Sequence, residues 1–307
     1  MSSRLLVSVP DETLRASLGE LPPGVEIVTW DLSGPAPTPS IDIVVVPYMR
    51  AAQVMERLRD VSTRLIQSQS IGYDGVAEIL PPGRVFANAA SVHEASTAEF
   101  TVALILAAQR GIADFVRAAD KGLWAPTFHE SLADRTVLLV GYGGVARAVE
   151  ARLEPFEVTI VRVAHTARDD ERGPIHAVSS LPTLLPEADI VVVAVPLTDE
   201  TTHLVDRTFL SHMRDASLLV NVARGRVADT DALVNEARSG RLRLALDVVD
   251  PEPLPPDHPL FALDNVLISP HVGGVTSAMR PRMARLLERQ ITRMLDGEEP
   301  VNVVLRS

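Results

Sequence analysis

The chain has 307 residues, of which 46% are hydrophobic and 22% charged, and it carries a formal net charge of −11. This length allows two domains of ordinary size, each with its own core. The negative charge argues against a nucleic-acid or anionic-membrane partner, because both require a basic surface. The absence of cysteine excludes disulfides and thiolate chemistry. We find no signal peptide and no apolar run near the roughly 20 residues that span a bilayer, so we expect a cytoplasmic protein.

The first third of the chain alternates short strands and helices. We predict strands at Leu5–Val9, Val25–Trp30, Ile41–Val46 and Leu65–Gln69, and a helix over Ala51–Arg59. Strands separated by helices indicate a parallel sheet flanked by helices. A long helix rich in alanine and leucine follows, at roughly Glu94–Arg110.

The middle of the chain repeats this alternation more strongly. We predict further strands at Thr136–Val140, Val158–Val163, Ile190–Ala194, Ser217–Asn221, Arg243–Asp247 and Val266–Ile268. The segment Asp250–Pro259 has five prolines and must be a stiff, irregular loop. A helix at about Thr276–Leu295 and a short apolar tail, Val301–Leu305, close the chain. The pattern predicts an α/β fold.

A glycine-rich turn is the strongest local signal. The predicted strand ending at Val140 runs into Gly141-Tyr142-Gly143-Gly144-Val145-Ala146 and then into a helix. This is the dinucleotide fingerprint in its G-x-G-x-x-A form. Gly141 permits the tight turn, Gly143 lets the backbone approach a pyrophosphate, and the helix N-terminus offers N–H groups to the phosphates. We therefore expect a dinucleotide here, although glycine can also serve packing alone.

The predicted strand Val158–Val163, which follows the glycine-rich turn and its helix, lacks at its end the acid that usually selects NAD. Such an acid bonds the ribose hydroxyls and repels a 2′-phosphate, but the strand here is followed by Ala164. The nearby basic residues Arg162, His165 and Arg168 favour NADP. Arg168, which we place in the loop after this strand, is the better candidate for the phosphate, whereas Arg162 can also be a residue of the strand alone. Three acids follow Arg168 at once and weaken this preference, so NAD stays open.

Three polar residues follow other predicted strands. Arg224 comes after Ser217–Asn221, Glu252 lies in the proline-rich loop, and His271 follows Val266–Ile268. Since strand carboxyl ends share one edge of a doubly wound sheet, these side chains can meet beside a bound dinucleotide. The set suits hydride transfer to a 2-keto acid. Arg224 would hold the carboxylate or carbonyl, and His271 would donate the proton.

In the same hypothesis Glu252 would favour the charged imidazole and orient the ring. Each residue also has a plainer interpretation: Arg224 and Glu252 as solvated loop residues, Asp247 as a turn cap, His271 as part of a turn. Their shared location after predicted strands of a cofactor fold makes the chemical interpretation the stronger one. A serine hydrolase is disfavoured because no G-x-S-x-G occurs, and a metal site because no two histidines form a close ligand pair.

With these motifs, the sequence resembles the D-isomer-specific 2-hydroxyacid dehydrogenases along nearly its whole length. The motifs occur in the family's order: SIGYDGV at 70–76, ASTAEFTVALILAAQR at 95–110, KGLW at 121–124, VGYGGVARAV at 140–149, VPLTDETTHLV at 195–205, NVARGRVADTDAL at 221–233, LDVVDPEPLPPDHPLF at 246–261 and SPHVGGVT at 269–276.

The resemblance implies roles for individual residues. Arg224, Glu252 and His271 match the catalytic arginine, glutamate and histidine, and Asp247 matches the aspartate that contacts the nicotinamide amide. Ser70, Ile71 and Gly72 match the loop whose backbone amides bind the substrate carboxylate, with Tyr48 and Met49 expected to line the pocket. The resemblance places the cofactor against Gly141, Tyr142, Gly143, Gly144, Val145, His165, Arg168, Val195, Pro196, Thr202, Val222, Ala223, Arg224, Asp247, His271, Gly273 and Gly274.

The family's architecture implies a Rossmann-type dinucleotide-binding domain inserted into a flavodoxin-like substrate domain. By this resemblance residues 1–92 and 277–307 form the substrate domain, and residues 93–276 form the dinucleotide-binding domain. The family is usually dimeric, so we expect a homodimer with the helix near 94–110 at the interface and Trp124 reaching toward the partner.

The leading hypothesis is an NADP-dependent reductase of small 2-keto acids such as glyoxylate or hydroxypyruvate, which it would bind as its small-molecule partner. An NAD-dependent dehydrogenase of another 2-hydroxy acid, including 3-phosphoglycerate, is the alternative within the family. A dinucleotide-sensing binding protein is the alternative from another class, since some relatives act as corepressors.

Overall fold

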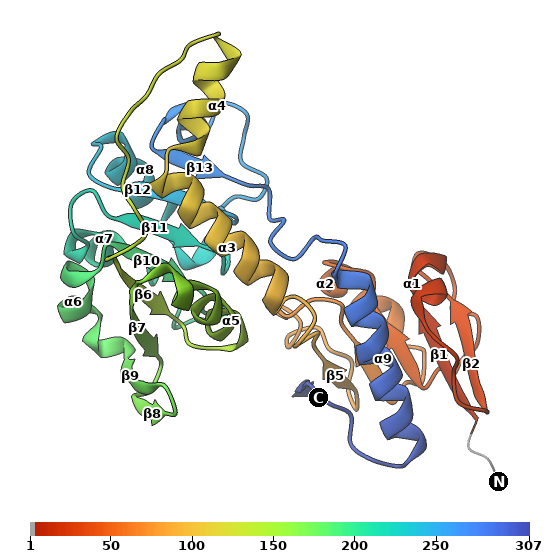
Figure 1. Ribbon diagram of the computed structural model, residues 1–307. Helices are drawn as coiled ribbons and strands as arrows, with labels where there is room; N and C mark the ends of the chain where they lie inside the picture. Colours follow the sequence, from red (N-terminus) through yellow and green to blue (C-terminus); the bar gives the residue numbers. More distant parts are fainter. Residues whose placement is uncertain (1–3) are drawn as a thin grey trace. The chain divides into compact units, whose positions relative to one another are not determined.

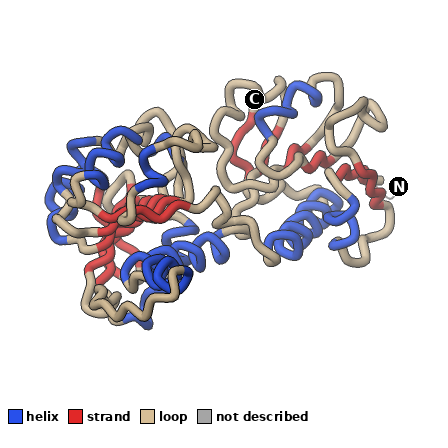
Figure 2. Tube along the Cα trace, turned by 90° about the horizontal axis from the view of Figure 1, so that it is seen from above, coloured by secondary structure: helices blue, strands red, loops and turns tan. Residues whose placement is uncertain are grey.

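The polypeptide passes from one compact unit into a second at Glu94 and returns after Gly274. Unit 1 comprises Met1–His93 with Val275–Ser307, and unit 2 comprises Glu94–Gly274 (Figure 1). The structure is a computed structural model, and it describes residues 4–307. In both units the strands form a central sheet with helices around it (Figure 2).

The sheet of unit 1 has the strand order β14-β5-β4-β3-β1-β2. Its parallel strands follow the flavodoxin-type order 2-1-3-4-5, and β14 pairs antiparallel with β5 at one edge. The elements of this unit are β1 Leu5–Val9, α1 Glu12–Ser17, β2 Val25–Thr29, β3 Ile43–Val45, α2 Ala51–Val54, β4 Leu65–Gln67, β5 Val85–Ala87, α9 Met279–Leu295 and β14 Val303–Arg306.

Alternating side chains of these strands enter cores on opposite faces of the sheet, as the two-residue repeat of a strand requires. Ile43 and Val45 of β3 face one core, which also contains Leu287 and Ile291 of α9. Val44 of the same strand faces a second core. The C-terminal helix is thus part of unit 1, where it packs against α1.

The sheet of unit 2 has the strand order β13-β12-β11-β10-β6-β7-β9-β8. From β9 to β12 this is the 3-2-1-4-5-6 order of a Rossmann fold. The elements are α3 Glu94–Gln109, α4 Ile112–Asp120, β6 Thr136–Val140, α5 Gly144–Leu153, β7 Thr159–Ala164, β8 Arg168–Asp170, β9 Gly173–Ala177, α6 Leu181–Leu184, β10 Ile190–Val193, α7 Arg207–His212, β11 Leu218–Asn221, α8 Thr230–Arg238, β12 Arg243–Leu246 and β13 Val266–Ile268.

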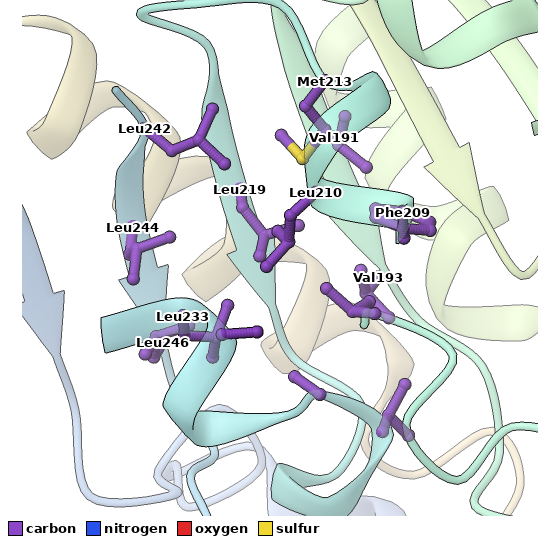
Figure 3. Packing of buried hydrophobic residues seen from close by; sticks show 14 of the residues in the cluster. Val191, Val193, Phe209, Leu210, Met213, Leu219, Leu233, Leu242, Leu244 and Leu246 are labelled. Carbon is purple, nitrogen blue, oxygen red and sulfur yellow. The ribbon is translucent and has the colours of Figure 1, made fainter. Parts of the chain in front are cut away.

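The parallel strands of unit 2 are buried on both faces, which explains their continuous apolar sequences. Val191 and Val193 of β10 face the helices α7 and α8, where Phe209, Leu210 and Leu233 complete the core (Figure 3). Ile190 and Val192 face the opposite core, together with residues of α3 and α5. The predicted α/β class is confirmed.

Four short strands are absent from the sequence-based prediction. They are β5, β8, β9 and β14, of three to five residues each. Such short segments carry no periodic pattern, and β9 begins at Gly173-Pro174. β8 corrects one placement, because Arg168 is the first residue of this exposed strand and not part of a loop.

Short 3₁₀ turns join several elements: Met55–Leu58, Glu154–Phe156, Val178–Ser180, Leu185–Glu187, Gly225–Val227 and Pro259–Ala262. None of the helices in residues 4–307 is both long enough and apolar enough to cross a membrane.

Candidate active site and cofactor site

The turn after β6 has the geometry that a pyrophosphate requires. Gly141 has a φ of +93°, and a Cβ there would lie 2.7 Å from Cγ1 of Val195 and 2.8 Å from the backbone of Ala194, which follow β10. Only glycine fits this switch point between β6 and β10. Gly143 faces open space, and as the N-cap residue of α5 it brings no side-chain hydrogen bond to the helix N-terminus. The amides of the first turn therefore remain available to phosphate oxygens.

Tyr142 lies below this turn in a buried ionic network. Its hydroxyl donates a hydrogen bond to Glu150 of α5, whose side chain is 2% exposed. Burial, followed by the hydrogen bond to Glu150, raises the pKa of Tyr142 to about 12. Burial also acts to raise the pKa of Glu150, but the hydrogen bonds from Arg162 and Tyr142 outweigh it and leave this pKa lowered. Only the backbone of Tyr142 can thus face a cofactor.

Arg162 of β7 belongs to the same network. Its Nε donates to Oε1 of Glu150 at 2.8 Å, and its Nη1 donates to the carbonyl of Arg172 at 2.7 Å. Its guanidinium also lies over the Tyr142 ring, 5.7 Å from the centroid. The sequence placed Arg162 among the cations near a 2′-phosphate. The structure instead gives it a structural role beneath the phosphate-binding turn.

Two exposed basic side chains, those of His165 and Arg168, lie beyond the end of β7. Arg168 donates through Nη2 to the carbonyl of Tyr142 at 3.4 Å, which links its side chain to the glycine-rich turn. His165 lies with Nδ1 3.6 Å from Oε2 of Glu200. β7 ends at Ala164, so no carboxylate occupies the position that would bond a ribose diol.

The loop after β11 presents Arg224. Asn221 holds this loop by accepting from the amide of Ala223 at 3.0 Å and donating to the carbonyl of Arg224 at 3.1 Å. The next residue touches the loop after β12, because a Cβ on Gly225 would lie 1.8 Å from the carbonyl oxygen of Val249. The two loops therefore share one packed surface at the carboxyl edge of the sheet.

His271 and Glu252 form a hydrogen-bonded pair at this edge. Nδ1 of His271 lies 3.0 Å from Oε2 of Glu252, with side chains 23% and 38% exposed. Burial acts to raise the pKa of Glu252, but the hydrogen bond and charge of His271, with a further contribution from Arg224, leave it lowered. Glu252 is therefore a carboxylate at neutral pH, and Nε2 of His271 is directed away from that bond.

Asp247 fixes the backbone that carries His271. It is 3% exposed and accepts hydrogen bonds from Ser269 Oγ at 2.7 Å and from the amides of Val272 and Gly273 at 2.9 Å each. His271 has a φ of +54°, a conformation that needs such support in a residue with a side chain. Its own amide donates to the carbonyl of Asp247 at 2.8 Å.

The predicted substrate residues Tyr48, Met49 and Ser70–Gly72 lie in unit 1. Tyr48 and Met49 follow β3, and Ser70–Gly72 follow β4, so both segments leave the carboxyl edge of that sheet. The amide of Met49 lies 3.4 Å from Oγ of Ser70, which places the two segments beside each other. Tyr48 is half-buried and Met49 is 46% exposed.

The structure thus brings together Arg224, Asp247, Glu252 and His271 in unit 2, and the two predicted substrate segments in unit 1. Sequence reasoning missed the network of Tyr142, Glu150 and Arg162, for which the charged Arg162 within an apolar strand was the available signal. It also missed His93, whose Nε2 lies 2.6 Å from the carbonyl oxygen of Gln69. Within residues 4–307 no group of three or more histidine and acidic side chains could hold a metal ion.

Comparison with known proteins identifies the family of the chain. The family model of the D-isomer specific 2-hydroxyacid dehydrogenase NAD binding domain matches residues 102–273. A glyoxylate reductase from Thermofilum pendens is 36% identical over 264 residues, covering 82% of this chain and 77% of the relative.

Solved structures resemble the chain over almost its whole length. A D-isomer specific 2-hydroxyacid dehydrogenase from Xanthobacter autotrophicus Py2, in complex with NADPH and MES, has a TM-score of 0.82 and 26% identity, covering 99% of this chain and 98% of that one. An NADPH-dependent glyoxylate/hydroxypyruvate reductase from Sinorhizobium meliloti, in complex with NADP and malonate, has a TM-score of 0.79 and 26% identity, covering 99% and 97%.

The glycine-rich turn on a Rossmann sheet, the residues at the sheet's carboxyl edge and these matches lead to one conclusion. The chain belongs to the D-isomer specific 2-hydroxyacid dehydrogenase family and is an NAD(P)-dependent oxidoreductase.

Proposed function

We propose that the chain is an NADPH-preferring reductase of small 2-keto acids, such as glyoxylate or hydroxypyruvate. The observation that carries this proposal is the His271–Glu252 pair at the carboxyl edge of a Rossmann sheet, on a surface shared with the Arg224 loop. In this assignment unit 2 binds the dinucleotide, and the segments predicted to bind the substrate lie in unit 1.

The residues of the site divide the chemistry between them. When bound, the nicotinamide supplies the hydride. His271, as imidazolium, donates the proton from Nε2 to the carbonyl oxygen, and in the oxidation direction it accepts that proton. Glu252 stabilises the charged ring and fixes its orientation through Nδ1. Arg224 holds the carboxylate or carbonyl of the keto acid with its planar guanidinium.

The cofactor is held by the turn Gly141–Val145 and by the loops that begin at Val195, Val222 and Gly273. The preference for NADPH rests on Arg168 and His165 near the end of β7, together with the absence of an acid at Ala164. A guanidinium binds a phosphate dianion through charge-assisted hydrogen bonds, whereas an acid there would repel it. One solved structure with this fold, from Sinorhizobium meliloti, is that of an NADPH-dependent glyoxylate/hydroxypyruvate reductase, which supports the assignment.

NAD is the alternative cofactor, and one observation favours it. Asp169 and Asp170 lie on β8 directly beside Arg168, and their charges oppose a phosphate dianion. The chain would then be an NAD-dependent dehydrogenase of another 2-hydroxy acid, 3-phosphoglycerate included.

We also propose that the protein is a homodimer through α4 and the loop that follows it. Every residue of α4 is at least partly exposed, including Ile112, Phe115 and Val116, and Leu123, Trp124 and Phe128 are exposed in the loop. Both segments extend beyond the sheet of unit 2 (Figure 1). A nine-residue helix without a buried face needs a partner to be stable, and apolar residues gathered in this way mark protein interfaces.

The partner surface is supported by a cavity of about 540 Å³ next to α4, which Phe128 lines together with Ala108 and Leu267. Light scattering, which measures the molar mass in solution, tests this proposal with the variant Phe115→Ser. A shift toward monomers is expected, and a dimer unchanged by this substitution and by Leu123→Ser would contradict it.

The proposed reaction is tested by oxidation of NADPH and NADH, in parallel, with glyoxylate, hydroxypyruvate, pyruvate and bulkier 2-keto acids. We expect faster turnover with NADPH and a small keto acid. Turnover with NADH alone would assign the alternative cofactor. If neither cofactor turns over although both bind, a dinucleotide-sensing role would replace the reductase.

A further inference from the structure

In the loop Ser68–Gly72 of unit 1, four successive carbonyl groups accept hydrogen bonds from the rest of the unit. The carbonyl of Ser68 accepts from Nε2 of Gln67 at 2.8 Å, and that of Gln69 lies 2.6 Å from Nε2 of His93. The carbonyl of Ser70 accepts from the amide of Ala89 at 2.9 Å, and that of Ile71 accepts from Nδ2 of Asn88 at 2.9 Å. Four successive carbonyls are thus fixed from the interior of the unit.

The amides of Ser68 and Ser70 donate to the carbonyl of Ala87 at 2.8 Å and to Oγ of Ser68 at 3.0 Å, whereas those of Ile71 and Gly72 are left for another acceptor. Within residues 4–307 the N–H groups of Ile71 and Gly72 make no hydrogen bond to the protein, and both residues are partly exposed. Successive N–H groups without partners form a binding site for an anion. Holding the carbonyls from behind sets the direction of these N–H groups, because each peptide unit is planar.

His93 differs from the other donors that hold the loop. His93 is 4% exposed. Because the carbonyl of Gln69 can only accept a hydrogen bond, Nε2 of His93 carries the proton. The remaining donors are the side-chain amides of Gln67 and Asn88 and one backbone amide. His93 is also the last residue of unit 1 before the chain enters α3, so nothing in the Rossmann chemistry requires an imidazole there.

The face of the imidazole is also in contact with a neighbouring ring. The ring of Tyr48 stacks on it with a centroid distance of 5.5 Å and an angle of 26° between the ring planes. Tyr48 precedes Met49, whose amide approaches Oγ of Ser70. One buried ring therefore fixes both segments proposed to meet the substrate: the loop with the available amides through Nε2, and the segment after β3 through stacking.

We propose that His93 is a positioning residue for binding of the substrate carboxylate. Its Nε2–H holds the Gln69–Ser70 peptide so that the following amides can bind the carboxylate, and its ring holds Tyr48 at the substrate side chain. The identity of the anion as a 2-keto acid rests on the proposed function, whereas the anion site does not.

Two substitutions separate the hydrogen bond from the ring contact. His93→Phe keeps a ring against Tyr48 but removes the donor, and His93→Gln restores a donor without the ring. For His93→Phe we expect the KM for the keto acid to rise about tenfold, the usual effect of leaving a buried acceptor unpaired. We expect kcat and the dissociation constant of NADPH to stay close to those of the unsubstituted protein.

The glutamine variant should recover most of the lost affinity while changing the preference among keto acids, because Tyr48 loses its stacking partner. His212→Phe, on α7 of unit 2, is the matched control and should leave KM unchanged. An unchanged KM in His93→Phe, or a glutamine variant with a KM as high as the phenylalanine variant, would overturn the proposal.

Calorimetric titration with oxalate, in the presence of NADP⁺, separates this proposal from the reaction itself. If no keto acid turns over but oxalate binds about tenfold more weakly to His93→Phe and nearly normally to His93→Gln, the anion site stands and only the reaction is wrong. Equal oxalate affinity in all three proteins, or no binding to the unsubstituted protein, would overturn the positioning role.

Should His93→Phe not fold, ¹⁵N NMR of the unsubstituted protein gives the answer directly. The proposal requires His93 to be protonated on Nε2 and its nitrogen resonance to shift when oxalate is added. A proton on Nδ1 alone, or a resonance that oxalate leaves unmoved, would contradict it.

Discussion

The imidazole of His271 and the carboxylate of Glu252 are 19 residues apart in the chain, and yet Nδ1 and Oε2 lie 3.0 Å from each other. The pairing depends on two loops that leave neighbouring parallel strands, β12 and β13, at the same edge. Asp247 joins these loops by accepting the amides of Val272 and Gly273. The orientation of the proposed acid is therefore built into the strand order.

Replacing Glu252 with glutamine tests the electrostatic part of this pair. The pKa of Glu252 is lowered, so its charge persists as pH falls below the usual value of 4.5 and is lost only when pH drops through the lowered pKa. Across neutral pH the unsubstituted protein keeps the negative charge beside His271. In Glu252→Gln the imidazolium loses that partner, and we expect kcat/KM for reduction to fall about 10²-fold through misorientation of the acid.

The pH dependence of the reduction rate in the same variant tests whether the charge of the carboxylate is responsible. Because the pKa of Glu252 is lowered, its negative charge is lost only as pH falls through that value, so the rate of the unsubstituted protein should approach that of Glu252→Gln only in acid. A profile that coincides with that of the unsubstituted protein would mean that the carboxylate does not act on His271.

Cofactor preference should follow two positions near the end of β7. Arg168→Ala removes the exposed guanidinium and with it one charge-assisted hydrogen bond to the 2′-phosphate of NADPH. We therefore expect the KM for NADPH to rise about tenfold. The KM for NADH, which has no 2′-phosphate, should not change. Ala164→Asp should move the preference toward NADH by supplying the acid that bonds a ribose diol. Steady-state kinetics with both cofactors measure each change. Arg238→Ala, on the exposed end of α8, is the control, and equal losses with both cofactors would remove Arg168 from phosphate binding.

The contact between the Arg224 loop and the loop after β12 should tolerate no Cβ. In Gly225→Ala the new atom would lie 1.8 Å from the carbonyl oxygen of Val249, so backbone must move and displace Arg224. We expect kcat/KM to fall about 10²-fold, the usual cost of a displacement near 1 Å in a catalytic site. Gly34→Ala, at a position with open space, is the matched control. Similar kinetics for both variants would show that the loops can shift without consequence.

The buried network below the glycine-rich turn should act on stability. Glu150→Gln leaves the guanidinium of Arg162 without its carboxylate, and removing one partner of a buried pair costs about 3–5 kcal/mol. Urea unfolding measures this loss at neutral pH. Because the pKa of Glu150 is lowered, its contribution is present above the unfolded-state value and fades as pH falls through the folded-state value. The two proteins should therefore converge in acid, and a difference that persists there would contradict the ionic origin.

Much of the fold could be predicted because its strands are buried on both faces. Segments such as Val137–Val140 and Ile190–Val193 are apolar throughout, and they are followed by Gly141 and, after two more residues, by Pro196. The strands β5 and β9 could not be found in this way, because a three- to five-residue strand is stabilised by its neighbours and not by its own pattern.

The candidate site could likewise be predicted only in part. Arg224, Glu252 and His271 could be found because each is a polar residue after a predicted strand. Their pairing could also be expected, since parallel strands share a carboxyl edge. The role of Arg162 could not, because only the folded chain shows Glu150 beneath it. His93 was hidden for the same reason: its partners, Gln69 and Tyr48, come from loops whose approach depends on tertiary structure.

Single-turnover oxidation of NADPH by His271→Asn, with saturating keto acid, tests the central claim most directly. Asparagine keeps a polar side chain of similar size but cannot donate an acidic proton. We predict that cofactor binding is retained and that the rate of hydride transfer falls by about 10²- to 10⁴-fold, the usual contribution of a general acid. His212→Asn should react like the unsubstituted protein. A near-normal rate in His271→Asn would contradict the account and leave His271 as a residue that merely completes the turn after β13.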